Sequence, residues 1–122
     1  KADCIFARNV IPHVDNIHGV ISGMAHCIKD EGIAIVEFHY GEKIMSELQY
    51  DSIYHEHLCY LSLTPLMKFL ESFNIEVFDV SRLNFGASGP SIRVFMQKKG
   101  GREKISNNGG DPVRGPWLRK RN

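Results

Sequence analysis

The feature that most constrains the fold is a strand, helix and strand pattern in the first third of the chain. Residues 3–7 form a short apolar run that predicts a buried strand. Residues 17–28 carry apolar side chains at helical spacing, and residues 33–38 form a second apolar run rich in β-branched residues. The connections are short, so the pattern predicts a βαβ unit with two neighbouring parallel strands.

Polar and glycine residues are suited to the two ends of the predicted helix. Asp15 or Asn16 can cap its beginning, because a short polar side chain accepts hydrogen bonds from the free amides of the first turn. Gly32 can end it, because glycine readily adopts the left-handed conformation of a helix carboxyl cap.

The second half of the chain predicts one more helix and two antiparallel strands. Thr64 and Pro65 are suited to the cap and the first position of a helix that ends at Asn74. Residues 75–80 and 91–97 read as strands, and no helix separates them, so an antiparallel pair is expected. The predicted fold class is therefore α/β: a βαβ unit, then a helix and a closing antiparallel pair.

The basic charge of the chain is concentrated at its carboxyl end. Residues 98–122 contain eight basic and two acidic residues, whereas the remainder contains seven basic and twelve acidic ones. Residues 98–122 are also rich in Gly and Asn, so we expect a folded unit at residues 1–97 and a flexible tail after it. The folded part is not expected to bind nucleic acid through its charge.

Other sequence features argue against a membrane segment and a structural metal site. No apolar run approaches the roughly 20 residues that cross a bilayer, and we expect a cytoplasmic protein without membrane partners. Cys4, Cys27 and Cys59 are widely spaced and form no C-x-x-C pair, so we expect reduced cysteines in the core.

The densest group of chemically active residues is Tyr54-His55-Glu56-His57, with Asp51 shortly before it. Imidazoles, carboxylates and a phenol are the groups that transfer protons near neutral pH. If the segment is extended, Tyr54 and Glu56 share one face and the two histidines share the other. A polar surface loop and a metal site chelated by His55 and His57 are the alternatives.

Further candidates lie where the two predicted parallel strands end, because ligands of such sheets gather at the carboxyl edge. Asn9 can donate and accept hydrogen bonds there, and His13 can act on a proton, anchor a substrate or serve a structural role. Glu37 ends the second strand, where it can meet a ligand or face solvent.

Three segments together resemble the sugar-nucleotide C-methyltransferases that make branched deoxysugars. They are residues 7–14 (Ala-Arg-Asn-Val-Ile-Pro-His-Val), residues 50–58 with Leu61-Ser62-Leu63, and the run Gly-Ala-Ser-Gly-Pro-Ser-Ile-Arg-Val that ends at Val94. The resemblance spans about residues 3–96. It implies part of a class I methyltransferase sheet, Rossmann-like, whose last strands lie in the order four, five, seven, six. It also implies transfer of the S-adenosylmethionine methyl group to a carbon beside the keto group of a 4-keto-6-deoxy sugar nucleotide.

The resemblance assigns roles to matching residues. It implies that His57 is the base, that Tyr54 and His13 contact the sugar and stabilise the enolate, and that Glu56 orients the group. It places Arg8 and Asn9 near the methionine portion of the cofactor. It implies no metal ligand among these residues.

The chain departs from this family in two ways that limit what it is expected to do alone. The family's zinc-binding domain and its glycine-rich cofactor loop have no counterpart in this sequence. We therefore expect a carboxyl-terminal half of a methyltransferase domain that is inactive by itself. The alternatives are a non-catalytic module that forms a homodimer through the exposed sheet edge, and a small metal-binding protein.

Overall fold

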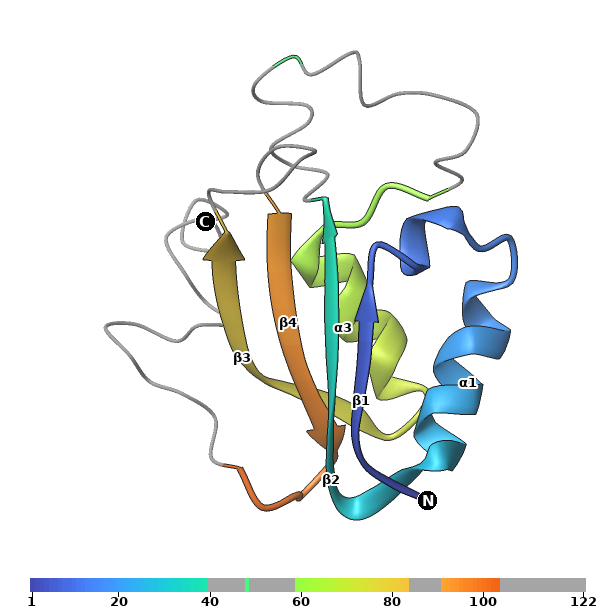
Figure 1. Ribbon diagram of the computed structural model, residues 1–122, viewed down its shortest axis with the longest axis vertical. Coiled ribbons are helices and arrows are strands. Elements are labelled where there is room, and N and C mark those ends of the chain that lie inside the picture. The colour runs from blue at the N-terminus through green and yellow to red at the C-terminus, as the bar shows by residue number, and fades with distance from the viewer. Residues whose placement is uncertain (40–47, 49–58, 84–90, 104–122) are drawn as a thin grey trace.

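The computed structural model describes residues 1–39, 48, 59–83 and 91–103 of the 122-residue chain. These residues form a sheet of four strands in the order β1-β2-β4-β3, with two α-helices on one of its faces (Figure 1). The elements in chain order are β1 (Ala2–Arg8), the 3₁₀ turn η1 (Ile11–His13), α1 (Ile17–Cys27), β2 (Ile28–His39), α3 (Leu63–Glu71), β3 (Ile75–Leu83) and β4 (Ser91–Lys98).

The strand pairing confirms the predicted fold class. β1 pairs with β2 in parallel, with Phe6 opposite Ile35, and α1 connects the two strands as in a βαβ unit. β4 pairs antiparallel with both β2 and β3. The resulting order is the four, five, seven, six arrangement that the resemblance implied.

Gly32 does not end the first helix, so that prediction is wrong. α1 ends at Cys27, and β2 begins at the next residue and continues through Gly32. The register moves from Ala2 opposite Ile28 to Cys4 opposite Ile33, so β2 bulges beside β1. A Cβ on Gly32 would lie 2.9 Å from the Ala2 carbonyl oxygen. Gly32 is therefore suited to the close approach of the β1 backbone, not to a left-handed cap.

The helix caps follow the sequence in one case and depart from it in the other. Asn16 caps α1 as predicted, and its Oδ1 accepts a hydrogen bond of 2.8 Å from the Gly19 amide. α3 begins one residue before the predicted cap Thr64, with Ser62 at the cap position. Pro65 is accommodated within the first turn, where its missing amide hydrogen costs no intrahelical bond.

The core lies between the sheet and the helices. Alternate residues of the central strands β2 and β4 point to this side of the sheet. The buried contacts join Ala34, Val36 and Phe38 of β2 and Ile92, Val94 and Met96 of β4 to Ile21 of α1 and Leu66 and Leu70 of α3.

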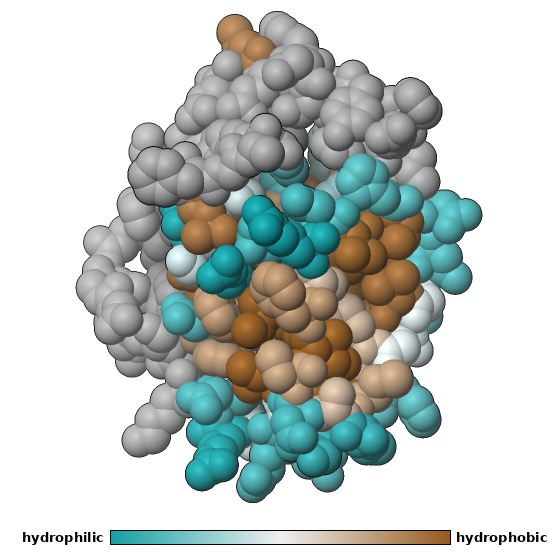
Figure 2. All heavy atoms as spheres, in the orientation of Figure 1, coloured by the Kyte–Doolittle hydropathy of each residue, from teal (hydrophilic) through white to brown (hydrophobic). Residues whose placement is uncertain are grey.

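β1 is an edge strand among the described residues, and the prediction that it is buried is wrong. Phe6 is 54% exposed, and Asp3 and Cys4 are exposed as well. No described element covers the sheet face opposite the helices, and Figure 2 shows an apolar area in the middle of that face. β1 therefore has the apolar composition of a buried strand, although the described residues cover only one of its faces.

The cysteines are free, as predicted, but they do not all belong to the core. Cys4 and Cys27 are exposed because they lie on the outer side of β1 and at the end of α1. Cys59 is half-buried, and burial raises the pKa of its thiol.

The carboxyl end of the fold extends slightly beyond the predicted boundary. β4 runs to Lys98, and the Gln97 side chain exchanges hydrogen bonds of 2.8 and 2.9 Å with the backbone of Glu103. The flexible tail remains a prediction, because residues 104–122 lie outside the described ones. Neither described α-helix is long and apolar enough to span a bilayer.

Replacement of Gly32 by Ala is predicted to lower the free energy of unfolding by about 1–3 kcal/mol, because the new Cβ forces Ile28 or the β1 backbone to move. Urea unfolding followed by circular dichroism measures the effect. Gly23→Ala is the matched control: its Cβ meets no atom within 4 Å, and helix propensity predicts a gain of up to about 1 kcal/mol. Equal stability of Gly32→Ala and the wild type would contradict the proposed close approach.

Candidate functional site

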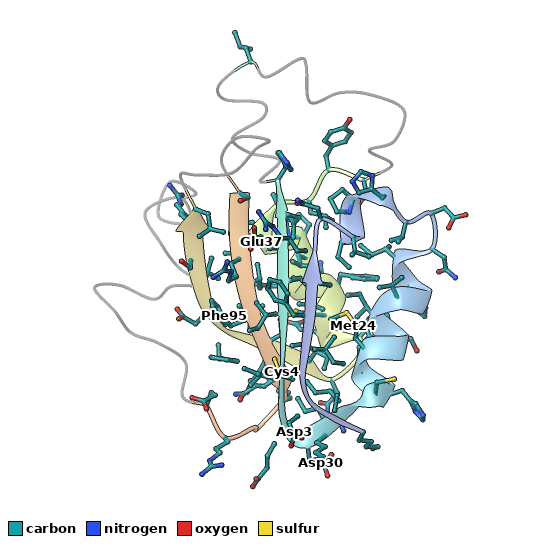
Figure 3. The ribbon with its side chains drawn as sticks, in the orientation of Figure 1. Asp3, Cys4, Met24, Asp30, Glu37 and Phe95 are labelled. Carbon is teal, nitrogen blue, oxygen red and sulfur yellow. The ribbon has the colours of Figure 1, made fainter. Side chains whose placement is uncertain are left out.

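The candidate site lies at the carboxyl ends of β1 and β2. The two parallel strands end side by side, with Arg8 of β1 opposite Glu37 of β2. Figure 3 shows Glu37 toward this end of the sheet, far from Asp3 and Asp30 at the opposite end. The turn η1 follows β1 directly and stays at the same edge, so the residues between Arg8 and His13 are held there.

Glu37 is held between two arginines from neighbouring strands. Its side chain is 5% exposed, one oxygen lies 3.2 Å from Arg8 Nε, and the other lies 2.9 Å from an Arg93 terminal nitrogen. Arg93 Nε donates a second hydrogen bond of 3.2 Å to that oxygen. The alternative in which Glu37 faces solvent is therefore wrong. A buried carboxylate is stable only when it is paired in this way.

The Arg8–Glu37–Arg93 cluster carries one positive charge in excess, because two guanidinium groups share one carboxylate. The side chains of Arg8 and Arg93 remain 59% and 36% exposed. Each guanidinium has five N–H donors, so donors remain for an anionic or hydrogen-bonding ligand.

Asn9 adopts a backbone conformation that most residues avoid. Its φ angle is 53°, and its amide donates a hydrogen bond of 2.8 Å to the Glu37 carbonyl oxygen. Asn tolerates the left-handed region better than most residues. The turn this produces leaves the Asn9 side chain exposed at the strand end, where it was predicted to meet a ligand.

The turn η1 carries His13 at the carboxyl edge of the sheet. Ile11 and Pro12 are buried and anchor the turn, whereas His13 is exposed. The Cys59 amide donates a hydrogen bond of 3.2 Å to the Pro12 carbonyl oxygen. Cys59 follows His57 by two residues in the sequence, and Pro12 precedes His13 in η1.

The structure thus brings together three of the six predicted site residues. Arg8, Asn9 and His13 share the carboxyl edge of the sheet. Tyr54, Glu56 and His57 lie outside the described residues, as does His55 of the alternative metal site. Among the described residues no group of three or more His, Cys, Asp or Glu side chains could hold a metal ion.

Sequence reasoning missed Arg93 as a member of the site. It lies in an apolar strand and enters the cluster only because antiparallel pairing sets it opposite Glu37. The available signal was a charged residue inside a strand that otherwise reads as buried, since such a residue needs a charged partner.

The sheet order is that of part of the class I methyltransferase fold. A SAM-dependent methyltransferase from Thermotoga maritima superposes with a TM-score of 0.63 at 16% identity, over 80% of this chain and 56% of that one. Magnesium protoporphyrin IX methyltransferase from Synechocystis PCC 6803, solved with bound SAH, gives 0.57 at 13% identity, over 79% of this chain and 44% of that one.

The sequence places the chain in a family within this fold. Residues 1–80 match the model of the family described as a methyltransferase domain, and the chain belongs to that family. It is also 33% identical over 94 residues to the C-methyltransferase NovU of Streptomyces niveus, which covers 77% of this chain. The chain spans 22% of NovU and about half of the two solved methyltransferases.

Replacement of Glu37 by Gln is predicted to lower the free energy of unfolding by about 1–3 kcal/mol, because both guanidinium groups lose a charged acceptor. Chemical unfolding measures the change in stability, and the substitution should also shift the amide NMR signals of Arg8 and Asn9. Glu31→Gln is the control, since Glu31 is exposed and a change within about 0.5 kcal/mol is expected. The same small change in both variants would show that the Arg8–Glu37–Arg93 cluster contributes little to the free energy of unfolding.

Proposed function

We propose that this chain is the carboxyl-terminal half of a SAM-dependent methyltransferase domain that methylates a carbon of a 4-keto-6-deoxy sugar nucleotide. The observation that supports the proposal is the Cys59 to Pro12 hydrogen bond, because Cys59 follows His57 by two residues in the sequence and Pro12 precedes His13 in η1. The similarity to a C-methyltransferase supports transfer to carbon rather than to oxygen or nitrogen.

The residues of the carboxyl edge suit the methionine end of the cofactor. The exposed Arg8, in a cluster with excess positive charge, would bind a carboxylate, and the Asn9 side chain would donate and accept hydrogen bonds beside it. S-adenosylmethionine supplies an electrophilic methyl group when it is bound. In this proposal the chain's own residues generate the nucleophile that accepts it.

The proposed chemistry begins with removal of a proton from the carbon beside the keto group. His57 takes this proton, and the electron pair of the C–H bond moves to the ketone to form an enolate. Tyr54 and His13 donate hydrogen bonds to the enolate oxygen, where the negative charge develops. Glu56 orients the imidazole or the phenol. S-adenosylmethionine, when bound, would supply the methyl group to the enolate carbon, and S-adenosylhomocysteine would be the leaving group.

The chain alone is predicted to bind S-adenosylmethionine at best weakly, because in this proposal it supplies only the methionine end of the cofactor site. Isothermal titration calorimetry with the purified chain tests this. A dissociation constant in the micromolar range would contradict the proposal that a further half of the domain is needed.

In the complete domain, His57→Asn is predicted to reduce the transfer rate by about 10²- to 10⁴-fold, because a positioned base is lost. Cofactor affinity should remain nearly unchanged, since the base acts on the sugar carbon. Tyr54→Phe should reduce the rate less, because His13 also stabilises the enolate. Single-turnover kinetics with a 4-keto sugar nucleotide measures both variants.

One further experiment and one outcome separate this prediction from its alternatives. Catalytic use of His57 predicts that zinc titration of the isolated chain gives the same result for the wild type and His57→Ala, whereas the metal-site alternative predicts that His57→Ala loses zinc binding. If His57→Asn transfers methyl at a near-normal rate, the base assignment is wrong.

A further inference from the structure

We propose that Val10 and Tyr60 form the surface that recognises the C6 group of the sugar and that selects a 6-deoxy sugar. The C6 group of such a sugar is a methyl group, whereas an ordinary hexose carries a hydroxymethyl group there. The inference rests on the proposed function in taking His13 to contact the 4-keto sugar. It adds to that function the residues that distinguish two sugars with the same reacting carbon.

Exposed apolar side chains lie at the turn η1. Among the described residues four large hydrophobic side chains are exposed, and Val10 and Tyr60 are two of them, at 43% and 44%. Ile11 and Pro12, which follow Val10 in the turn, are buried and anchor it. The exposed Asn9 and His13 lie on either side of these three residues in the sequence. Apolar side chains beside a few polar ones are the usual lining of a small-molecule site.

Two backbone hydrogen bonds bring Val10 and Tyr60 close to His13. The His13 amide donates a bond of 3.0 Å to the Val10 carbonyl oxygen, and the Cys59 amide donates a bond of 3.2 Å to the Pro12 carbonyl oxygen. His13 follows Pro12 and Tyr60 follows Cys59, so each lies one residue from an end of the second bond. The imidazole therefore has an exposed aliphatic residue and an exposed aromatic residue as neighbours.

The backbone of Tyr60 is held on both sides. The Cys59 amide is bonded to η1 on one side. On the other side Leu61 packs against the core, and Leu63 is the buried first residue of α3. An aromatic side chain on a fixed backbone has few torsions left to order, so it offers contact area to a ligand at a low entropic cost.

The structure of the proposed substrate places its C6 group close to the oxygen that His13 contacts. That oxygen is on C4, and the C6 group is attached to C5, the ring neighbour of C4. The side chains that flank His13 are therefore within reach of the C6 group. A methyl group loses no hydrogen bond when it packs against valine and the face of a tyrosine ring. A hydroxymethyl group at the same place would lose hydrogen bonds to water.

The nucleobase is the other apolar group of a sugar nucleotide that an aromatic ring could bind. Stacking of a base on Tyr60 would be favourable in itself. A diphosphate separates the base from the sugar ring, however, whereas Tyr60 is a neighbour of the residue proposed to contact the ketone. The position of Tyr60 therefore favours the sugar over the base.

Titration of the intact chain with thymidine-diphosphate-6-deoxyglucose and with thymidine-diphosphate-glucose tests the inference, because the two ligands differ only at C6. The amide NMR signals of Val10, His13 and Tyr60 should shift with the 6-deoxy ligand. This ligand should bind about 4-fold or more tightly than the other, which is the factor expected from burial of one methyl group.

Four variants examine the two side chains. Val10→Thr keeps the shape of the side chain and adds a hydroxyl group, so it should remove most of the preference by giving the hydroxymethyl group a partner. Tyr60→Ala should weaken binding of the 6-deoxy ligand by about 4-fold or more, because the apolar contact is lost. Tyr60→Phe should keep the preference, because the ring face makes the contact. Phe6→Ala removes an exposed aromatic side chain from β1 and is the matched control, which should change neither affinity.

Equal affinity for both ligands would overturn the inference, as would binding that leaves the signals of Val10 and Tyr60 unchanged. Absence of binding up to about 10 mM ligand would overturn it as well. If thymidine diphosphate alone reproduces the shift of Tyr60, the base occupies the ring and the inference is wrong. The proposed function is decided separately. A chain that prefers the 6-deoxy ligand, in a complete domain that transfers no methyl group to a 4-keto-6-deoxy sugar nucleotide, would contradict that function and leave the recognition of C6 intact.

Discussion

The pairing of β2 with strands on both of its sides is the constraint on which the rest of the structure depends. Its parallel bonds to β1 bring the two strand ends to one edge, and its antiparallel bonds to β4 bring Arg93 opposite Glu37. Without the first pairing, Asn9 would have no Glu37 carbonyl to hold its turn. Without the second, the carboxylate of Glu37 would lose one of its two arginines. The candidate site is thus assembled by one strand.

The sequence predicted the order and type of these elements because each has a strong local signal. The β-branched run after Gly32 and the helical spacing from Ile17 are visible without any tertiary information. The boundary errors have a different origin. Glycine is a residue type typical of helix caps. Gly32 instead lies within β2, where the β1 backbone approaches closely, and the local sequence carries no information on that approach. The prediction that β1 is buried was wrong for a similar reason. An apolar strand has the same sequence pattern whether or not other elements cover both of its faces.

The site was predictable to the extent that strand ends are predictable. Arg8 ends β1, and Asn9 and His13 come shortly after it, so the edge on which they lie follows from the βαβ pattern alone. Arg93 is distant in sequence and became part of the site only through strand register. The same limit explains why Glu37 could be read either as a ligand contact or as a solvent-facing carboxylate. Its burial depends on two arginines that different strands contribute.

The apolar row of Phe6 and Ile35 and the charged row of Arg8 and Glu37 are adjacent on one face of the sheet. A helix laid over Phe6 and Ile35 would also exclude water from the neighbouring Arg8 and Glu37. Electrostatic interactions strengthen as water is excluded, so an anionic group bound by Arg8 would gain from the cover even without touching it. The cover would also restrict the Arg8 side chain, which now has 59% of its surface in solvent. This is a physical reason for the charged row and the apolar row to lie side by side.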